Sequence, residues 1–153
     1  MQSLTSHLAL LSLTAAQFIT FSITDFNFTG STNSPNAIYS LSVSQNNSAA
    51  EPVLCYHTTA TDFSIEFFPE TSCKDESWTY SWDAAFPGSP DAGNAVNITH
   101  KGAAADGMDL QARLVLSHDA VQEHVVDGVS VEYLNQGYGT GYGVDFDLTA
   151  SEI

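Results

Sequence analysis

The chain has 153 residues and carries 18 acidic side chains against three basic ones, a formal net charge of −15. This length suits one domain. Aromatic residues make up 11% of the sequence, more than a disordered acidic tail contains. The three cations, Lys74, Lys101 and Arg113, can neutralise few phosphates. The charge therefore excludes nucleic acid and anionic membranes as partners.

The first 16 residues are typical of a secretory signal peptide. An apolar stretch runs from Leu8 to Leu13, and the small residues Thr14 and Ala16 precede a cleavage site before Gln17. The stretch is too short to cross a bilayer, which takes about 20 apolar residues. We expect residues 1–16 to be removed and residues 17–153 to form a secreted, extracellular domain. A buried first helix is the alternative.

The remaining sequence alternates apolar and polar residues with a period of two, which predicts half-buried strands. Gly, Pro, Asn and Ser cluster between these runs, as turns require. In chain order, the apolar positions of the expected strands are Phe21 and Ile23; Tyr39, Leu41 and Val43; Phe63, Ile65 and Phe67; Trp78, Tyr80 and Trp82; Val96, Ile98 and His100; Leu110, Ala112, Leu114 and Leu116; Val129, Val131 and Tyr133; and Val144, Phe146 and Leu148.

Helical patterns are scarce. Residues 119–126 contain the one plausible helical turn, although their valines favour strand or loop, and Asp127-Gly128 predicts a hairpin turn or a bulge. Short strands separated by such turns favour an all-β fold. We predict a single antiparallel β-sandwich or β-barrel of about eight to nine short strands with one disulfide.

Cys55 and Cys73 are the only cysteines in the chain. An even number of cysteines in an exported protein predicts a disulfide, which would stabilise the fold by roughly 3 kcal/mol. Two separate buried thiols are the alternative.

Three sequons for N-glycosylation begin at Asn27, Asn46 and Asn97. Asn46 lies in the sequence most typical of a loop, so it is the first candidate for a glycan. Asn97 alternates with apolar neighbours and is compatible with the outward face of a strand.

We find no catalytic motif and predict neither catalytic residues nor a cofactor. His118 and His124 flank Glu123, but their spacing does not fit the helical zinc motif, and we predict no metal site. Aspartates at positions 106, 109, 127, 145 and 147 lie near glycine-containing turns. A solvated acidic face is a simpler interpretation of these aspartates than a calcium site.

Aromatic residues are the best candidates for binding a ligand or partner. Trp78 and Trp82 share one face of a strand with Tyr80, where they form either part of the core or an exposed platform. Tyr138 and Tyr142 alternate with glycines in residues 137–143, which indicates a recognition loop or a plain connection.

Residues 21–28 (FSITDFNF), residues 38–43 (IYSLSV) and the block from Cys55 to His100 with KDESWTYSWD resemble the small secreted fungal proteins related to the Alternaria major allergen. The resemblance covers roughly residues 21–100. It implies an exported β-barrel or β-sandwich that acts as an allergen, effector or elicitor, with phenolic ligands proposed for some members. Members often have further cysteines, which this chain lacks.

These observations favour a secreted, non-enzymatic protein that binds a host protein or a cell-wall or cell-surface component through loops, notably residues 45–52 and 137–143. A carrier of small phenolic ligands or glycans, with a ring-lined cavity of several hundred Å³, is the alternative. A small hydrolase with two carboxylates in one cleft is a third hypothesis.

Overall fold

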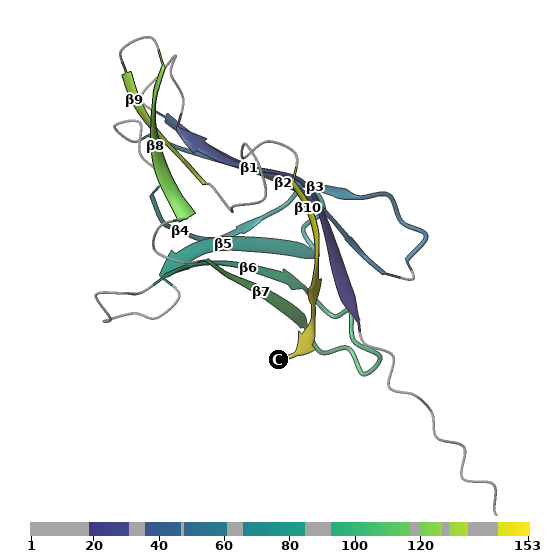
Figure 1. Cartoon of the computed structure of the whole chain (residues 1–153). Coiled ribbons are helices and arrows are strands. Elements are labelled where there is room, and N and C mark those ends of the chain that lie inside the picture. The colour runs from purple at the N-terminus through teal and green to yellow at the C-terminus, as the bar shows by residue number, and fades with distance from the viewer. Residues whose placement is uncertain are drawn as a thin grey trace, which may run out of the picture.

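The computed structural model describes residues 19–30, 36–46, 48–60, 66–84, 93–116, 120–126, 129–134 and 144–153. These residues form strands joined by short connections (Figure 1). In chain order the strands are β1 (Thr20–Gly30), β2 (Asn36–Gln45), β3 (Val53–Ala60), β4 (Phe68–Ser72), β5 (Trp78–Ala84), β6 (Asn94–His100), β7 (Leu110–Leu116), β8 (Val121–Val126), β9 (Val129–Leu134), β10 (Val144–Thr149) and β11 (Ser151–Glu152).

The strands form two antiparallel sheets that pack face to face. One has the order β3-β2-β1-β9-β8, with β10 also paired to β1, and the other has the order β11-β7-β6-β5-β4. The described strands therefore make a β-sandwich and do not close into a barrel, which decides between the two predicted architectures. Figure 1 shows the hairpin of β8 and β9 projecting beyond the sandwich.

A bulge in β1 sets which side chains enter the core. Phe21 and Ile23 face inward, but Phe26 and Phe28 are buried as well, so the alternation changes phase between the two pairs. The pairing with β2 and β10 shifts register at this point, where Asp25 has a positive φ of 54°. Aspartate tolerates this conformation better than most residues. The extra residue keeps the side chains of all four of these residues on the same face of the sheet.

Aromatic rings from both sheets interlock at the centre of the core. The Phe28 ring on β1 contacts the Tyr39 ring on β2 at a centroid distance of 5.1 Å. It also meets Trp82 on the opposite sheet edge-on at 5.6 Å. Tyr80 lies in the same layer, and its hydroxyl donates a hydrogen bond to the Tyr39 carbonyl oxygen at 3.1 Å. This bond and these rings tie the two sheets together.

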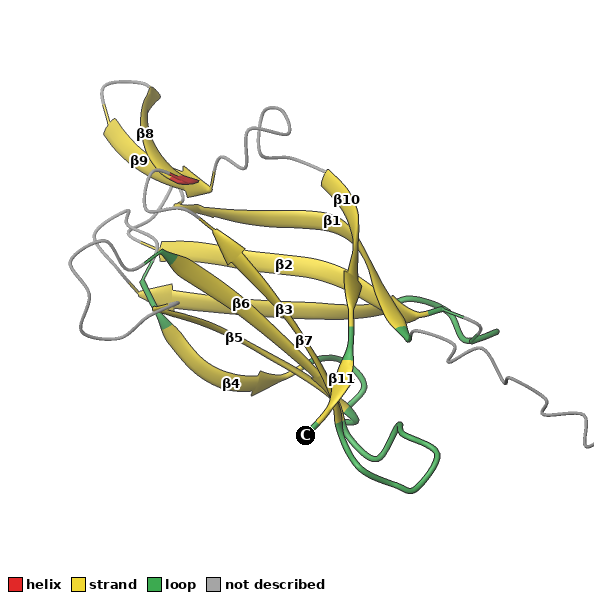
Figure 2. Ribbon diagram, turned by 60° about the horizontal axis from the view of Figure 1, so that its bottom comes forward, coloured by secondary structure: helices red, strands yellow, loops and turns green. Residues whose placement is uncertain are grey.

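The two sheets are also joined along both open sides of the sandwich. On one side, the disulfide Cys55–Cys73 links β3 to the turn after β4. On the other side, β10 leaves the six-stranded sheet at Ala150, and β11 continues in the five-stranded sheet beside β7 (Figure 2). The predicted disulfide is thus confirmed.

The observed strands differ from the expected ones in two respects. First, β3, β4, β8 and β11 are not among the alternating runs. Second, Phe67 of the expected run Phe63, Ile65 and Phe67 precedes β4 and is exposed, while Phe63 and Ile65 lie outside the described residues. In agreement with the sequence, residues 121–126 form a strand, as their valines favour, and Val126 pairs with Val129, as the hairpin interpretation predicts. The turn at residues 127–128 lies outside the described residues.

Candidate functional site

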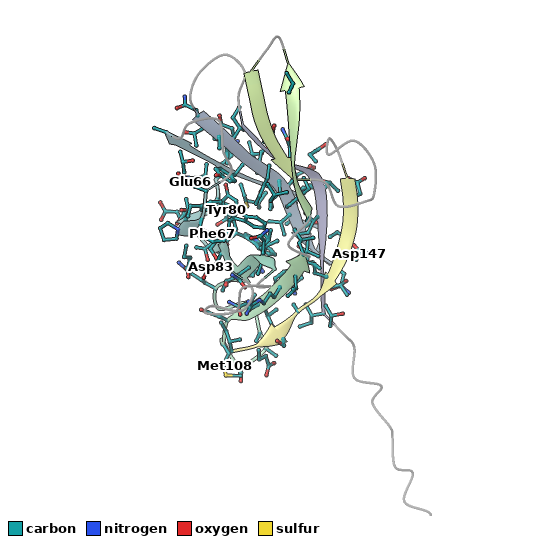
Figure 3. All side chains as sticks on the ribbon, turned by 60° about the vertical axis from the view of Figure 1, so that its left-hand side comes forward. Glu66, Phe67, Tyr80, Asp83, Met108 and Asp147 are labelled. Carbon is teal, nitrogen blue, oxygen red and sulfur yellow. A yellow bond between two sulfur atoms is a disulfide. The ribbon has the colours of Figure 1, made fainter. Side chains whose placement is uncertain are left out.

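Two segments of the five-stranded sheet enclose a surface pocket of about 240 Å³ at the β4 edge. Its walls are residues 67–70, at the start of β4, and residues 81–83, near the end of β5. We call it the Phe67 pocket. It opens to solvent, and Figure 3 shows Phe67 and Asp83 on the same side of the molecule.

The local sequence explains why the pocket forms here. Phe68 pairs with Trp82 and Thr71 with Tyr80, so β4 contains one extra residue between these pairs. The bulge coincides with Pro69, which has no N–H to contribute to the ladder. Phe68 points into the core, and the neighbouring Phe67 therefore points outward, with 52% of its surface exposed.

The ring of Phe67 is held in position by its neighbours. Its centroid lies 6.0 Å from that of Trp82, with the two planes tilted by 55°. Just before Phe67, the carbonyl oxygen of Glu66 accepts a hydrogen bond from the Tyr39 hydroxyl at 2.8 Å. This bond anchors the entrance of β4 to the opposite sheet. The exposed ring of Phe67 thus packs against the buried ring of Trp82.

Trp82 carries an unusual polar group. The side chain is 1% exposed, and its indole Nε1 has no hydrogen-bond partner among the described residues. Buried donors normally have partners, and one without a partner is costly. This donor is enclosed by the core and does not open into the Phe67 pocket, because the Trp82 side chain faces the interior.

Carboxylates surround the pocket. Glu70 and Asp83 line it, and Glu66 lies beside Phe67 in Figure 3. Lys101 approaches Glu70, with 3.7 Å between Nζ and Oε1, and both side chains are well exposed. Glu70 and Asp83 make the rim acidic, and Lys101 approaches it at the Glu70 side.

The other end of β5 is built differently. The ring of His100 stacks on Trp78 with 3.9 Å between centroids, and its Nδ1 lies 2.9 Å from the Gln45 side-chain oxygen. Burial lowers the pKa of His100, while the charge of nearby Asp75 acts in the opposite direction. Backbone and side-chain hydrogen bonds from Ser77 lower the pKa of Asp75. Histidine, indole and amide form a closed, structural contact between the sheets.

A second histidine lies under the pocket. The His57 ring packs against Phe68 at a centroid distance of 4.7 Å, and its other aromatic neighbour is Tyr39 at 6.0 Å. Burial lowers the pKa of His57. This histidine is a packing residue at the edge of the core.

The structure places the predicted aromatic candidates as follows. Trp78 and Trp82 are 4% and 1% exposed and face the interior, so an exposed platform made by this stripe is wrong and the core interpretation is correct. Rings at alternating positions of a strand lie on one face of the sheet, and the second sheet buries them when it packs on that face. Tyr138 and Tyr142 lie outside the described residues, as do residues 1–16, the expected signal peptide.

The three sequons occupy different settings. Asn97 lies on the outward face of β6, where its Nδ2 donates to the Ser81 hydroxyl at 3.2 Å. Asn46 follows β2, and its side-chain oxygen accepts the Thr20 N–H at 2.8 Å. Asn27 lies on β1 with a buried Oδ1 that has no partner in the described part of the chain. Glycosylation at these three positions stays a prediction.

The aspartates considered for calcium serve other purposes where the structure describes them. Asp109 accepts the Gly102 N–H at 2.7 Å, and Asp106 accepts the Met108 N–H at 3.1 Å, so both stabilise one turn. Asp145 and Asp147 are exposed on β10. Across the described ranges, no group of three or more His, Cys, Asp or Glu side chains is arranged to hold a metal ion.

Sequence reasoning missed the most informative residue, Phe67. It was assigned to the inward face of a strand with Phe63 and Ile65. The signal that contradicts this is the sequence Phe67-Phe68-Pro69, because adjacent strand residues point to opposite faces and proline disrupts the pairing.

The sequence matches no protein-family model and no curated protein sequence. In the part of the chain that is described, no helix is long and apolar enough to cross a membrane.

Proposed function

We propose that this protein is secreted and non-enzymatic, and that it binds a host protein or another component of a host cell surface. The observation that carries the proposal is the size and form of the Phe67 pocket. At about 240 Å³, it is smaller than the roughly 300–1,000 Å³ of sites that enclose a whole small ligand. An open pocket of this size fits one group that protrudes from a larger partner.

The pocket has the features of an interface anchor. Interface hot spots are enriched in aromatic residues that are rigid and surrounded by well-packed neighbours. Phe67 offers half of its surface to a partner, while Trp82 and the hydrogen bond at Glu66 restrict its movement. A partner that covers this ring gains apolar burial without having to order a mobile side chain.

Secretion is supported by the expected signal peptide and by the disulfide Cys55–Cys73, a bond common in secreted proteins. The resemblance to the secreted allergen and effector proteins points in the same direction. It also suggests a plant as the host.

The experiment measures binding of the labelled mature protein to plant protoplasts and to isolated cell walls. Phe67→Ser is compared with Val115→Ser, which removes an equally exposed apolar side chain (48% against 52%) from β7. We expect saturable binding that Phe67→Ser weakens by more than about tenfold and that Val115→Ser preserves. Absence of saturable binding, or equal binding by both variants, contradicts the proposal.

A cell-surface glycan is the second candidate, because the pocket combines an exposed ring with the Ser81 hydroxyl and two carboxylates. Protease treatment of the protoplasts distinguishes a protein partner from a glycan. Loss of binding after proteolysis indicates a protein partner, whereas binding to protein-free cell-wall polysaccharide indicates a glycan. Hydrolysis of that polysaccharide would instead support an enzyme.

A further inference from the structure

We propose that the Phe67 pocket receives a positively charged side chain, lysine or arginine, from a protein partner. This inference deepens the proposed function and rests on it. It assigns the chemical class of the group that enters the pocket.

Charge is the first argument. Glu70 and Asp83 line the pocket, and Glu66 lies at its approach (Figure 3). The protein as a whole carries a net charge of −15, so its field attracts basic segments and repels acidic ones. A phosphorylated, sulfated or carboxylated group would meet repulsion at every distance.

The exposed ring is the second argument. A cation is attracted to the face of an aromatic ring within about 6 Å of its centroid. Phe67 presents such a ring beside the two carboxylates, so a guanidinium or ammonium group can contact both at once. The stem of three methylene groups in arginine, or four in lysine, also covers apolar surface, here that of Phe67 and Pro69.

A peptide fits better than a metal ion. The described residues offer no group of three ligating side chains arranged around one point, and an aromatic ring coordinates no metal. A basic side chain needs no such set of ligands, because one carboxylate and the face of the Phe67 ring are enough to hold its charge.

The test uses nuclear magnetic resonance of the full mature protein labelled with ¹⁵N. The chain has two tryptophans, which give two separate indole signals. Trp82 lines the pocket, whereas Trp78 contacts His100 at the other end of β5 and serves as an internal control. The probe is N-acetyl-arginine amide. The neutral and nearly isosteric N-acetyl-citrulline amide is the matched control.

We expect N-acetyl-arginine amide to shift the indole signal of Trp82 and the backbone N–H signal of Phe67. N-acetyl-citrulline amide should shift neither signal. Asp83→Asn and Phe67→Leu should each weaken binding by about three- to fivefold. Asp145→Asn removes the same charge from β10 and should leave binding unchanged. Figure 3 shows Asp147, on the same strand, at the opposite side of the molecule from Asp83.

Three outcomes overturn the inference. Equal binding of citrulline amide shows that a neutral polar group is preferred. Shifts of Trp82 with a neutral sugar such as N-acetylglucosamine, and none with arginine amide, show a glycan site. Equal weakening by Asp145→Asn and Asp83→Asn shows diffuse electrostatic attraction only. If cell-surface binding still depends on Phe67 in any of these cases, the proposed function stands and only the chemical class is wrong.

Discussion

Trp78 and Trp82 stand four residues apart on β5 and face the same side of the sheet, yet the two ends of this strand differ in kind. At the Trp78 end, His100 stacks on the indole, and Gln45 from the opposite sheet contacts the imidazole. At the Trp82 end, the indole nitrogen has no partner among the described residues. The Phe67 pocket, which is open to solvent, adjoins this end of the strand.

The turn before β5 and the bulge in the neighbouring strand β4 explain this difference. The turn between Cys73 and Trp78 is short and held by backbone hydrogen bonds: Cys73 N–H donates to the Trp78 carbonyl at 2.9 Å, and Trp78 N–H donates to the Asp75 carbonyl at 3.0 Å. The disulfide then fixes this turn to β3. At the opposite end, the bulge at Pro69 pushes Phe67 outward and opens the edge of the sheet. One strand thus has an end closed by contacts between the sheets and an end beside a pocket that is open to solvent.

The largest expected effect concerns the Trp78 end of β5. Cys55→Ser should lower the free energy of unfolding by roughly 3 kcal/mol, because the unfolded chain regains the entropy of the open loop. For a domain of this size the melting temperature should fall by about 6–12 °C. Cys73→Ser should have the same effect, measured by calorimetry without reductant.

Reduction of the wild-type protein provides the control and should reproduce the same fall. Unequal effects of the two serine variants would contradict the view that the bridge alone stabilises this end.

A smaller effect should distinguish the two tryptophans. Trp82→Phe and Trp78→Phe both remove core volume, but Trp82→Phe also removes the unpartnered Nε1–H. We expect Trp78→Phe to be more destabilising by about 1 kcal/mol, since an unsatisfied buried donor costs free energy that its removal returns. Urea unfolding of both variants measures the difference. A larger loss for Trp82→Phe would mean that its indole nitrogen has a partner in the folded protein.

The smallest effect is a pH dependence at the Trp78 end of β5. Because burial lowers the pKa of His100 below its ordinary 6.5, the unfolded chain takes up the proton at higher pH than the folded one. Stability from this residue is therefore lost as the pH falls below 6.5. His100→Phe retains a ring on Trp78 without titrating.

Unfolding free energies at about pH 7.5 and about pH 5 should fall more in the wild type than in His100→Phe. Easing of carboxylate repulsion and protonation of His57 affect both proteins alike, so the difference isolates His100. Parallel pH profiles would show that the imidazole is equally accessible to protons in both states.

Part of the fold followed from local patterns. Tyr39, Leu41 and Val43 alternate with serines, and Trp78 and Trp82 follow the same rule, so their strands were predictable from neighbours two positions away. By contrast, the inward positions of β3 include His57 and Thr59 as well as Val53, a mixture that hydropathy does not mark as one face. The strand exists because β2 pairs with it along its length.

The candidate site was less accessible to sequence reasoning. Its chemistry depends on residues 67–70 meeting residues 81–83, and on Lys101, just after β6, reaching Glu70 across β5. Sequence distance does not determine these contacts. The phase change at Asp25 is a similar case, because the bulge follows from the need to cover both halves of β1 with one opposite sheet.

The sequence by itself determined the all-β class, the positions of most strands and the two cysteines that pair. These properties depend on the period-two geometry of a strand and on the number of cysteines. Only the tertiary structure decided that the sheets form a sandwich, that the tryptophans face inward and that Phe67 faces outward beside an acidic pocket. Each of these depends on which distant strands pack together, because the burial of a side chain is set by what covers it.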